Sequence, residues 1–400
     1  MKILIVSQYF WPEEFRINDL ALDLVERGHK VTVLTGNPNY PKGKFYQGYG
    51  FKFTTEIYSG IKIHRVPITP RGNSSGIKLL INYLSFVISG SLFACFHTQH
   101  YDKIFAVNYS PITALYPAIV YKKLKKIPLL IWVQDIWPES ITAAGKMQFS
   151  FAMTILNKLV RNIYRNSDKI LVQSEAFIPS IEEKGATKKQ IEYIPNWAED
   201  LYCDEKIFVE KFQNLIPSGF KIMFAGNIGE AQDFESILKA AEATKQYPEI
   251  KWLIVGDGRK KAWVETEIVR LELQKSVYLF GRYPLDDMPN LFVHADIMLV
   301  SLKDEKIFSL TIPSKIQSYM AFGKPIACML NGIGAEVIQE AKCGYVAKAM
   351  DYNSLAKNVI DAYKQDINSL MEKGLSGKKY YQQNFSKKMI IDRLIQLFSE

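Results

Sequence analysis

The second half of the chain holds a glycine-rich segment whose position suits phosphate binding. Gly226-Asn227-Ile228-Gly229 lies directly after a predicted strand and before a predicted helix. Glycines at such a place let the backbone approach a diphosphate, and the N-terminus of the following helix attracts anions. A plain tight turn would have the same composition, so both interpretations stay open. The pattern is not G-x-G-x-x-G, which disfavours a nicotinamide cofactor.

Two further strand ends in this half carry candidate ligand contacts. Gly256-Asp257-Gly258 follows the next predicted strand, but it has the composition of a common turn, and this structural interpretation is favoured. Arg282 follows the predicted strand Val277–Gly281, and its planar guanidinium suits a phosphate. A salt bridge between domains would explain Arg282 equally well.

The segment DEKIFSLTIPSKIQSYMAFGKPIACM is the most informative in the chain. Pro313 is suited to open a helix, which would place Ser314 and Lys315 in the first turn. Free backbone N–H groups, a hydroxyl and an ammonium would then meet at one anion site. A chance helix start at the surface is the alternative, and phosphate binding is favoured over it.

The sequence contains no D-x-D, the usual sign of a metal-chelated nucleotide diphosphate. We therefore expect no metal ion, and a departing diphosphate would be stabilised by arginine, lysine and backbone N–H groups. His97 and His100 lie at the end of a predicted apolar helix, and we do not expect them to bind a metal.

The first half offers carboxylates at two predicted loops. Glu13 and Glu14 lie in the loop after the first strand, where they could act as acid, base or acceptors for sugar hydroxyls. Alternatively, they only favour the start of the following helix. Asp135 ends the predicted strand Leu129–Asp135, and a contact with sugar hydroxyls or a developing positive charge is favoured over a capping role.

The order of predicted elements places these residues on two similar sheets. Apolar strand patterns alternate with helical patterns through both halves, which is typical of doubly wound α/β domains. Mixed charge across 197–219 predicts a linker between the two domains. We expect an N-terminal domain over 1–200, a C-terminal domain over 220–376 and a final helix over 377–400 that returns to the first domain.

Composition and charge narrow the class of protein. The apolar fraction is 48%, and the four cysteines have no metal-ligand spacing, so we expect a globular protein of a reducing cytoplasm. Residues 1–200 hold 24 Lys and Arg against 16 Asp and Glu, whereas 201–400 hold 26 against 25. The basic excess of the first half favours an anionic membrane surface, because no nucleic-acid-binding motif accompanies it.

Residues 77–97 form a long apolar segment with a single charge. Its length approaches that of a membrane span, but it lies between strands of one predicted sheet, so we reject a span. A buried helix is one interpretation, and a helix lying in the membrane interface is our hypothesis. Lysines 122, 123, 125 and 126 would supply charge to hold an anionic surface.

Several stretches of the sequence resemble the family 4 glycosyltransferases. These are QYFWPE, GHKVTVLTGNPNYPKGKFYQGY, QDIWPES, FAGNIGEAQ, LIVGDG and PSKIQSYMAFGKPI, which together extend over most of the chain. The closer likeness is to the WbuB/WcaI-like branch of O-antigen, capsule and colanic-acid gene clusters. The resemblance implies the GT-B fold, in which two Rossmann-like domains face each other across a cleft, and a retaining transfer from a UDP-sugar.

The resemblance also implies roles for individual residues. Gly226, Asn227, Gly229, Gly256 and Ser314 become candidates for binding the donor nucleotide, and Arg282 and Lys315 for stabilising the departing charge. Asp135 falls near the place where the wider family has an active-site histidine. Two features depart from the family: QYFWPEEF replaces a Gly-Gly loop, and Ser318 and Leu310 replace the two glutamates of an E-x7-E motif.

The sequence thus predicts a retaining, metal-independent glycosyltransferase. We expect a UDP-sugar donor, with L-N-acetylfucosamine as the first guess, and an undecaprenyl-diphosphate-linked sugar as acceptor, at the inner face of the plasma membrane. Asp135 and Glu13 would orient the sugars. The alternatives are a UDP-sugar 2-epimerase, a nicotinamide-dependent oxidoreductase and a non-catalytic protein that binds nucleotide sugars or lipid.

Overall fold

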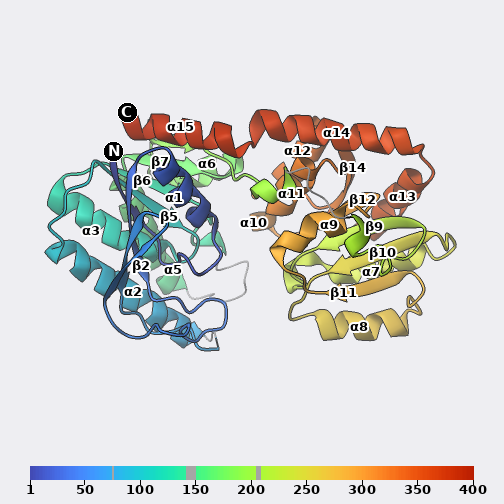
Figure 1. Ribbon diagram of the computed structural model, residues 1–400, viewed down its shortest axis with the longest axis horizontal. Coiled ribbons are helices and arrows are strands. Elements are labelled where there is room, and N and C mark those ends of the chain that lie inside the picture. Colours follow the sequence, from blue (N-terminus) through green and yellow to red (C-terminus); the bar gives the residue numbers. More distant parts are fainter. Residues whose placement is uncertain (74–75, 141–149, 204–208) are drawn as a thin grey trace. The chain divides into compact units, whose positions relative to one another are not determined.

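The computed structural model describes residues 1–73, 76–140, 150–203 and 209–400. The chain divides into two compact units, one made of Met1–Ile194 with Arg393–Glu400 and the other of Pro195–Asp392. Each unit is an α/β structure with helices packed on a mostly parallel sheet (Figure 1). The tandem α/β architecture predicted from the alternating strand and helix patterns is confirmed.

The first unit is built on one eight-stranded sheet. Its strands are β1 (Lys2–Val6), β2 (Lys30–Gly36), β3 (Thr54–Tyr58), β4 (Ile61–Val66), β5 (Lys103–Asn108), β6 (Leu129–Val133), β7 (Lys169–Val172) and β8 (Ile191–Tyr193). The described helices are α1 (Arg16–Glu26), α2 (Gly76–Phe96), α3 (Tyr116–Lys125), α5 (Ser150–Arg165) and α6 (Ile178–Glu183). The last turns of α15 (Lys387–Ser399) also belong here, and Phe398 meets Phe105 of β5 with ring centroids 5.5 Å apart.

The strand order of this sheet is β3-β4-β2-β1-β5-β6-β7-β8. Strand β3 pairs antiparallel with β4, and the other neighbours are parallel. The chain order reverses between β1 and β5, so the carboxyl ends of these two strands flank the place where open α/β sheets bind ligands. Strands β1, β5 and β6 are almost entirely buried, as expected when helices cover both faces.

The second unit has a six-stranded, fully parallel sheet. Its strands are β9 (Phe220–Ala225), β10 (Ile250–Val255), β11 (Val277–Gly281), β12 (Ile297–Ser301), β13 (Ile326–Met329) and β14 (Gly344–Ala347). The helices are α7 (Phe234–Ala243), α8 (Lys261–Arg270), α9 (Met288–Phe292), α10 (Lys306–Ser309), α11 (Ser314–Phe322), α12 (Ile333–Glu340), α13 (Tyr352–Tyr363) and α14 (Ile367–Asn384). The order β11-β10-β9-β12-β13-β14 reverses between β9 and β12.

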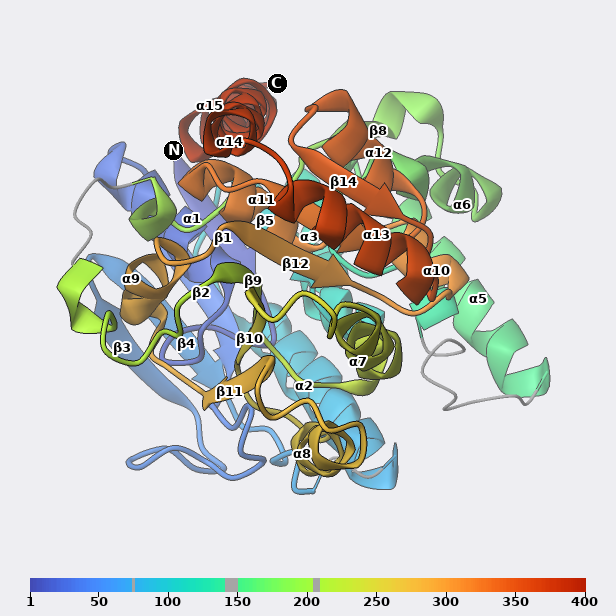
Figure 2. The same cartoon turned by 90° about the vertical axis from the view of Figure 1, so that its right-hand side faces the viewer.

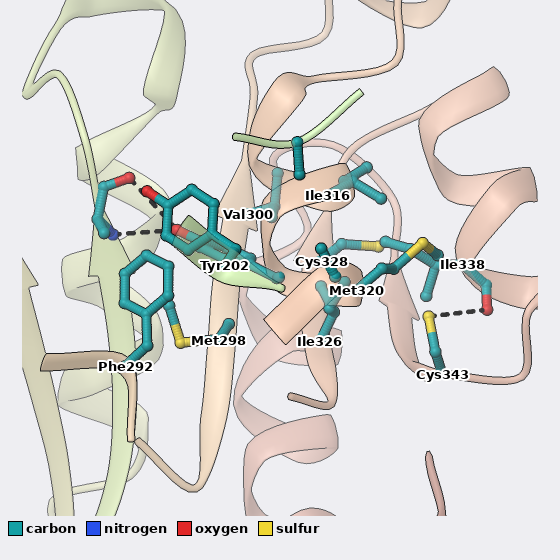
Figure 3. Close-up of a cluster of buried hydrophobic side chains, with 14 of the residues drawn as sticks. Tyr202, Phe292, Met298, Val300, Ile316, Met320, Ile326, Cys328, Ile338 and Cys343 are labelled. Atoms are coloured by element: carbon teal, nitrogen blue, oxygen red, sulfur yellow. Dashed lines mark hydrogen bonds between the residues drawn. The ribbon is translucent and has the colours of Figure 1, made fainter. Parts of the chain in front are cut away.

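Successive residues of these strands point to opposite faces of the sheet, and each face has its own hydrophobic core. Met223 and Leu253 point to the core shared with α11 and α12, whereas Ile222 and Trp252 point to the core under α7 and α13. Figure 2 shows α7 beside α13 on the second face. On the first face Tyr202 stacks on Phe292 with centroids 5.3 Å apart (Figure 3).

The stretch 197–219 does not form the separate linker that its mixed charge suggests. Its described residues belong to the second unit, where Trp197, Tyr202 and Phe212 are buried. The aromatic side chains decide this outcome, because burying each one outweighs the preference of its charged neighbours for solvent. The hairpin of β3 and β4 was also absent from the sequence-based prediction.

Helix α2 is the helix among the described residues that is long and apolar enough to cross a membrane by length and composition alone. It packs on α3 and on strands β2 and β4. Asn82, on its buried face, accepts a hydrogen bond from Gln8 at 2.8 Å and donates one to the Thr69 carbonyl at 2.6 Å. These bonds attach α2 to the sheet of the first unit.

Candidate active site

The loops after β9 and β10 approach each other so closely that only glycine fits. A Cβ on Gly256 would lie 1.8 Å from the carbonyl oxygen of Gly226. Both residues have positive φ angles, 139° at Gly226 and 148° at Gly256, which other residue types rarely adopt. The glycines therefore shape a smooth backbone floor at the carboxyl end of the sheet.

Backbone hydrogen bonds hold these loops together. The Gly226 N–H donates to Val255 at 2.8 Å, and the Gly256 N–H donates to Gly281 at 2.7 Å. The Ile228 N–H donates to the Asp257 carbonyl at 2.8 Å. The ends of β9, β10 and β11 consequently form one rigid rim.

A pocket of about 690 Å³ opens over this rim, large enough for a nucleotide. Two arginines at its wall, Arg259 and Arg282, are exposed. Among the described residues of the second unit neither has an ion-pair partner, so both are available to an anion. The residues that line the pocket are Gly226, Asn227, Val255, Gly256, Asp257, Gly258, Arg259, Arg282, Tyr283 and Met288.

Lys315 reaches the rim from the first turn of α11. A Cβ on Gly226 would lie 2.8 Å from the Lys315 Nζ, so the ammonium rests directly on that glycine. The Nζ also lies 3.5 Å from the centroid of the Phe224 ring. Burial lowers the pKa of Lys315 to about 7, and the described part of the chain provides no carboxylate to pair with it.

Helix α11 is fixed against the sheet next to this lysine. The Tyr319 hydroxyl accepts a hydrogen bond from the Ala225 N–H at 3.2 Å, which locks the helix to the last residue of β9. Pro313 is the N-cap residue rather than the first helical residue, and Ser314 is exposed in the first turn. The free N–H groups of that turn, the Ser314 hydroxyl and Lys315 thus lie at one helix end, as the sequence predicts.

Gly229 lies apart from the other predicted phosphate ligands. It lines a smaller hollow of about 50 Å³ together with Glu230, Lys260 and Lys303. Glu230 pairs with both lysines, and the hydrogen bonds that they donate lower its pKa to about 2. The Gly229 N–H donates to the Gln232 side chain at 3.1 Å. In this structure Gly229 shapes the loop and does not line the 690 Å³ pocket.

Glu199 was not identified from the sequence. Its carboxylate lies 3.4 Å from the Ser318 hydroxyl, so an acidic group stands beside the position where a glutamate was expected. The segment that carries Glu199 is fixed by the Gln317 amide, which donates to the Asn196 carbonyl at 2.8 Å. Because Glu199 and Ser318 are far apart in the sequence, no local sequence pattern predicts their contact.

Asp135 follows β6 in the first unit, at the carboxyl edge of that sheet. Its backbone carbonyl accepts a hydrogen bond from Asn108 at 2.9 Å, which ties the end of β6 to the end of β5. Burial raises the pKa of its carboxyl to about 6. Among the described residues its carboxylate has no hydrogen-bond partner, so it can accept bonds from a ligand.

Glu13 is buried, with one oxygen already bonded to the protein. Its Oε1 accepts hydrogen bonds from the backbone N–H groups of Asn39 and Tyr40, both at 2.7 Å. Burial raises the pKa of Glu13 to about 7 against the lowering effect of these bonds. The carboxylate thus anchors the loop after β2, whereas neighbouring Glu14 is exposed. This geometry assigns Glu13 a positioning role in place of the expected contact with sugars.

Comparison with known proteins identifies the chemistry that this architecture serves. Residues 14–197 match the family described as glycosyl transferase 4-like domain, and residues 207–379 match glycosyl transferases group 1. The chain is a glycosyltransferase.

Among the relatives of this glycosyltransferase are two bacterial proteins. It is 28% identical to the probable glycosyltransferase WbjE of Pseudomonas aeruginosa, over 81% of each chain. It is 25% identical to the putative colanic acid biosynthesis glycosyl transferase WcaI of Escherichia coli, over 81% of this chain and 82% of that one. Both relatives are named as glycosyltransferases, and the name of WcaI assigns that protein to colanic acid biosynthesis.

A solved structure supports the fold at low sequence identity. HepE of Anabaena, in complex with UDP and glucose, matches all of both chains with a TM-score of 0.70 and 17% identity. The glycosyltransferase has the GT-B fold of two Rossmann-like domains, as the sequence predicts. The assignment of its site residues rests on the geometry described above.

Proposed function

We propose that this enzyme is a retaining glycosyltransferase that uses a UDP-sugar without a metal ion. The observation that carries the proposal is the cationic pocket of the second unit, where Arg282 and Arg259 border a glycine floor and Lys315 lies against Gly226 of that floor. Their charges and the N–H groups of α11 suit a diphosphate. HepE, which shares the fold, was solved with UDP, and this supports the choice of nucleotide.

The reaction follows from the charges that must move. The acceptor hydroxyl attacks the anomeric carbon on the face from which UDP leaves, and the bond from that carbon to the phosphate oxygen breaks. The acceptor proton passes to the departing phosphate, while Arg282 and Lys315 stabilise the negative charge. The Asp135 carboxylate orients sugar hydroxyls, and Glu13 holds the loop after β2.

We further propose that the acceptor is a sugar on undecaprenyl diphosphate, with L-N-acetylfucosamine as the first donor to test. The name of the relative WcaI, from colanic acid biosynthesis, supports an acceptor used in surface polysaccharide assembly. A lipid-linked acceptor places the enzyme on the inner face of the plasma membrane. The exposed apolar residues of α2 in the first unit support attachment through the N-terminal domain.

The donor site is tested by turnover of Arg282→Ala and Lys315→Ala. Each change removes one charge from the departing diphosphate, so we expect kcat to fall roughly 10²- to 10³-fold. Arg270→Ala and Lys245→Ala are matched controls at exposed positions of the same unit and should keep the wild-type rate. Near-normal rates in both site variants, with circular dichroism unchanged, would refute this donor site.

The class of reaction is tested with a panel of UDP-sugars incubated with and without the lipid-linked acceptor. A transferase releases UDP when the acceptor is present, and the new glycosidic bond keeps the anomeric configuration of the donor, which NMR measures. Conversion of the donor alone would instead identify an epimerase. Inversion at the anomeric carbon would contradict the retaining mechanism.

A further inference from the structure

The first unit exposes an apolar surface that two separate elements build. Its residues are Phe51, Phe53 and Ile57 on the β3 segment and Ile88, Leu92 and Phe96 on α2. We call these six residues the β3–α2 surface. Phe53 is 58% exposed and Phe96 is 80% exposed, although both side chains are large and apolar. Contiguous exposed apolar residues of this kind mark interaction sites.

Beyond Lys78 in its first turn, the outward face of α2 is mostly apolar. A helix at the surface of a soluble protein normally turns polar residues to solvent. Here the exposed side chains on α2 include Ile77, Leu80, Ile81, Leu84, Ile88, Leu92 and Phe96. The inward face is already used, because Leu79, Asn82 and Phe86 are buried. The outward face therefore needs a partner outside the unit.

The register of the β3–β4 hairpin places a lysine on the same side as this surface. Ile57 pairs directly with Lys62, and Thr55 pairs with His64, so these side chains share one face of the sheet. The His64 ring contacts Phe93 of α2, with centroids 5.0 Å apart. The edge strand and the second half of α2 thus form one continuous face.

A hollow of about 380 Å³ lies where the two elements meet. It is lined by Phe53, Leu92, Phe93, Phe96 and His97. The His97 ring stacks on Phe93 at 4.6 Å, and burial lowers its pKa, so the imidazole is neutral at pH 7. The lining is consequently uncharged and suits a hydrocarbon chain.

Positive charge borders the hollow. Lys62 and Lys125 lie close enough to His97 to lower its pKa further. Lys52 is exposed between Phe51 and Phe53. Lys122, from the lysine cluster noted in the sequence, pairs with Asp168 at 2.7 Å and is less available. An apolar face bordered by lysines complements an anionic lipid surface.

We propose that the β3–α2 surface seats the enzyme on an anionic membrane leaflet, with Phe53 and Phe96 inserted and a lipid acyl chain in the hollow between them. The proposal deepens the membrane attachment proposed above and rests on it. Helix α2 lies along the interface and stays attached to its sheet through Asn82. The lipid-linked acceptor then meets the enzyme at the same leaflet.

The test is co-sedimentation of the full chain with phosphatidylglycerol-containing vesicles and with phosphatidylcholine vesicles. Phe53→Asp with Phe96→Asp should lower partitioning at least about tenfold, because two apolar side chains lose their burial. Met371→Asp with Leu375→Asp is the matched control on α14, where both residues are also exposed, and should leave partitioning unchanged. Equal binding by the first pair and wild type would overturn the proposal.

The charged border is tested separately. Lys62→Gln and Lys125→Gln should each lower binding to the anionic vesicles roughly fivefold and leave binding to phosphatidylcholine unchanged. An equal effect on both kinds of vesicle would contradict the role of charge.

A second variant keeps the side chain at position 96 apolar, so that misfolding does not account for its result. Phe96→Trp should show tryptophan quenching by lipids brominated in the acyl chain, whereas Leu375→Trp should not exceed wild type. Absence of extra quenching at position 96 would contradict insertion. None of these assays needs donor or acceptor, so their failure is distinct from a failure of the proposed transfer, which a water-soluble short-chain acceptor measures alone.

Discussion

Lys315 provides a quantitative test of the donor site, because its charge depends on pH near neutrality. Burial lowers its pKa from 10.5 to about 7. At about 1.36 kcal/mol per pH unit, this corresponds to roughly 5 kcal/mol of destabilisation of the ammonium form in the empty site. A bound diphosphate supplies the missing counter-charge and raises the pKa again. Binding of UDP above pH 7 should therefore take up a proton.

The expected signature is a dissociation constant for UDP that rises with pH. Between pH 7 and the pKa of the bound state, it should increase up to about tenfold per pH unit, because the free enzyme must first regain the proton. Secondary phosphate ionisation, near pH 6 for phosphomonoesters, is complete in this range. Calorimetry at pH 7, 8 and 9 in buffers of different ionisation heat measures both the affinity and the proton uptake.

Substitution of this lysine by methionine separates the effect of charge from that of packing. Lys315→Met should bind UDP about 10- to 100-fold more weakly at pH 7 and show no proton uptake. The stability of the free enzyme depends on pH in the opposite sense to its UDP affinity, because the contribution of Lys315 to the free energy of unfolding rises with pH. The unfolded chain binds more protons than the folded chain between pH 7 and 10.5, so the penalty from Lys315 is greatest below pH 7. The methionine variant without ligand should gain most in Tm there. A pH-independent UDP affinity of the wild type would refute the assignment.

Three further substitutions test the remaining parts of the site. Gly226→Ala should reduce UDP affinity at least about tenfold, because the added Cβ would lie 2.6 Å from Lys315 Cε and the residue has a φ of 139°. Gly28→Ala is the control, because Gly28 also has a positive φ but has open space around it, and this change should leave UDP affinity unaltered. Asp135→Asn should lower kcat roughly 10²-fold and remove a fall in rate below about pH 6, which a pH–rate profile measures. Glu13→Ala should cost about 2–3 kcal/mol of unfolding free energy in urea, and Glu13→Gln much less, because an amide oxygen still accepts the two N–H bonds.

Much of the fold could be predicted because the parallel strands are nearly continuous apolar runs. The predicted strand at Val277–Gly281 has the observed bounds. The β3–β4 hairpin could not be predicted in this way, because β3 is an edge strand on which half-buried and exposed residues alternate without a clear apolar period. Its exposed Ile57, together with Phe51 and Phe53 just before the strand, belongs to the proposed membrane surface.

The candidate site was predictable where a residue follows a strand or begins a helix. Gly226, Arg282 and Lys315 were found in this way. Their mutual contacts were not, because the approach of Lys315 to Gly226 depends on how α11 packs on β9 through Tyr319. The proximity of Glu199 to Ser318 is of the same kind, since it joins two segments only in the folded unit. For Glu13, the position in the loop could be predicted, but its burial could not.

Acceptor-dependent release of UDP in the presence of EDTA tests the central claim most directly. The enzyme is mixed with UDP-sugar donors, with and without a synthetic polyprenyl-diphosphate sugar, and free UDP is measured. The cationic pocket predicts release that requires the acceptor and proceeds at an unchanged rate in EDTA. Release that EDTA abolishes and added Mg²⁺ or Mn²⁺ restores would contradict a diphosphate site built from Arg282, Lys315 and backbone N–H groups alone.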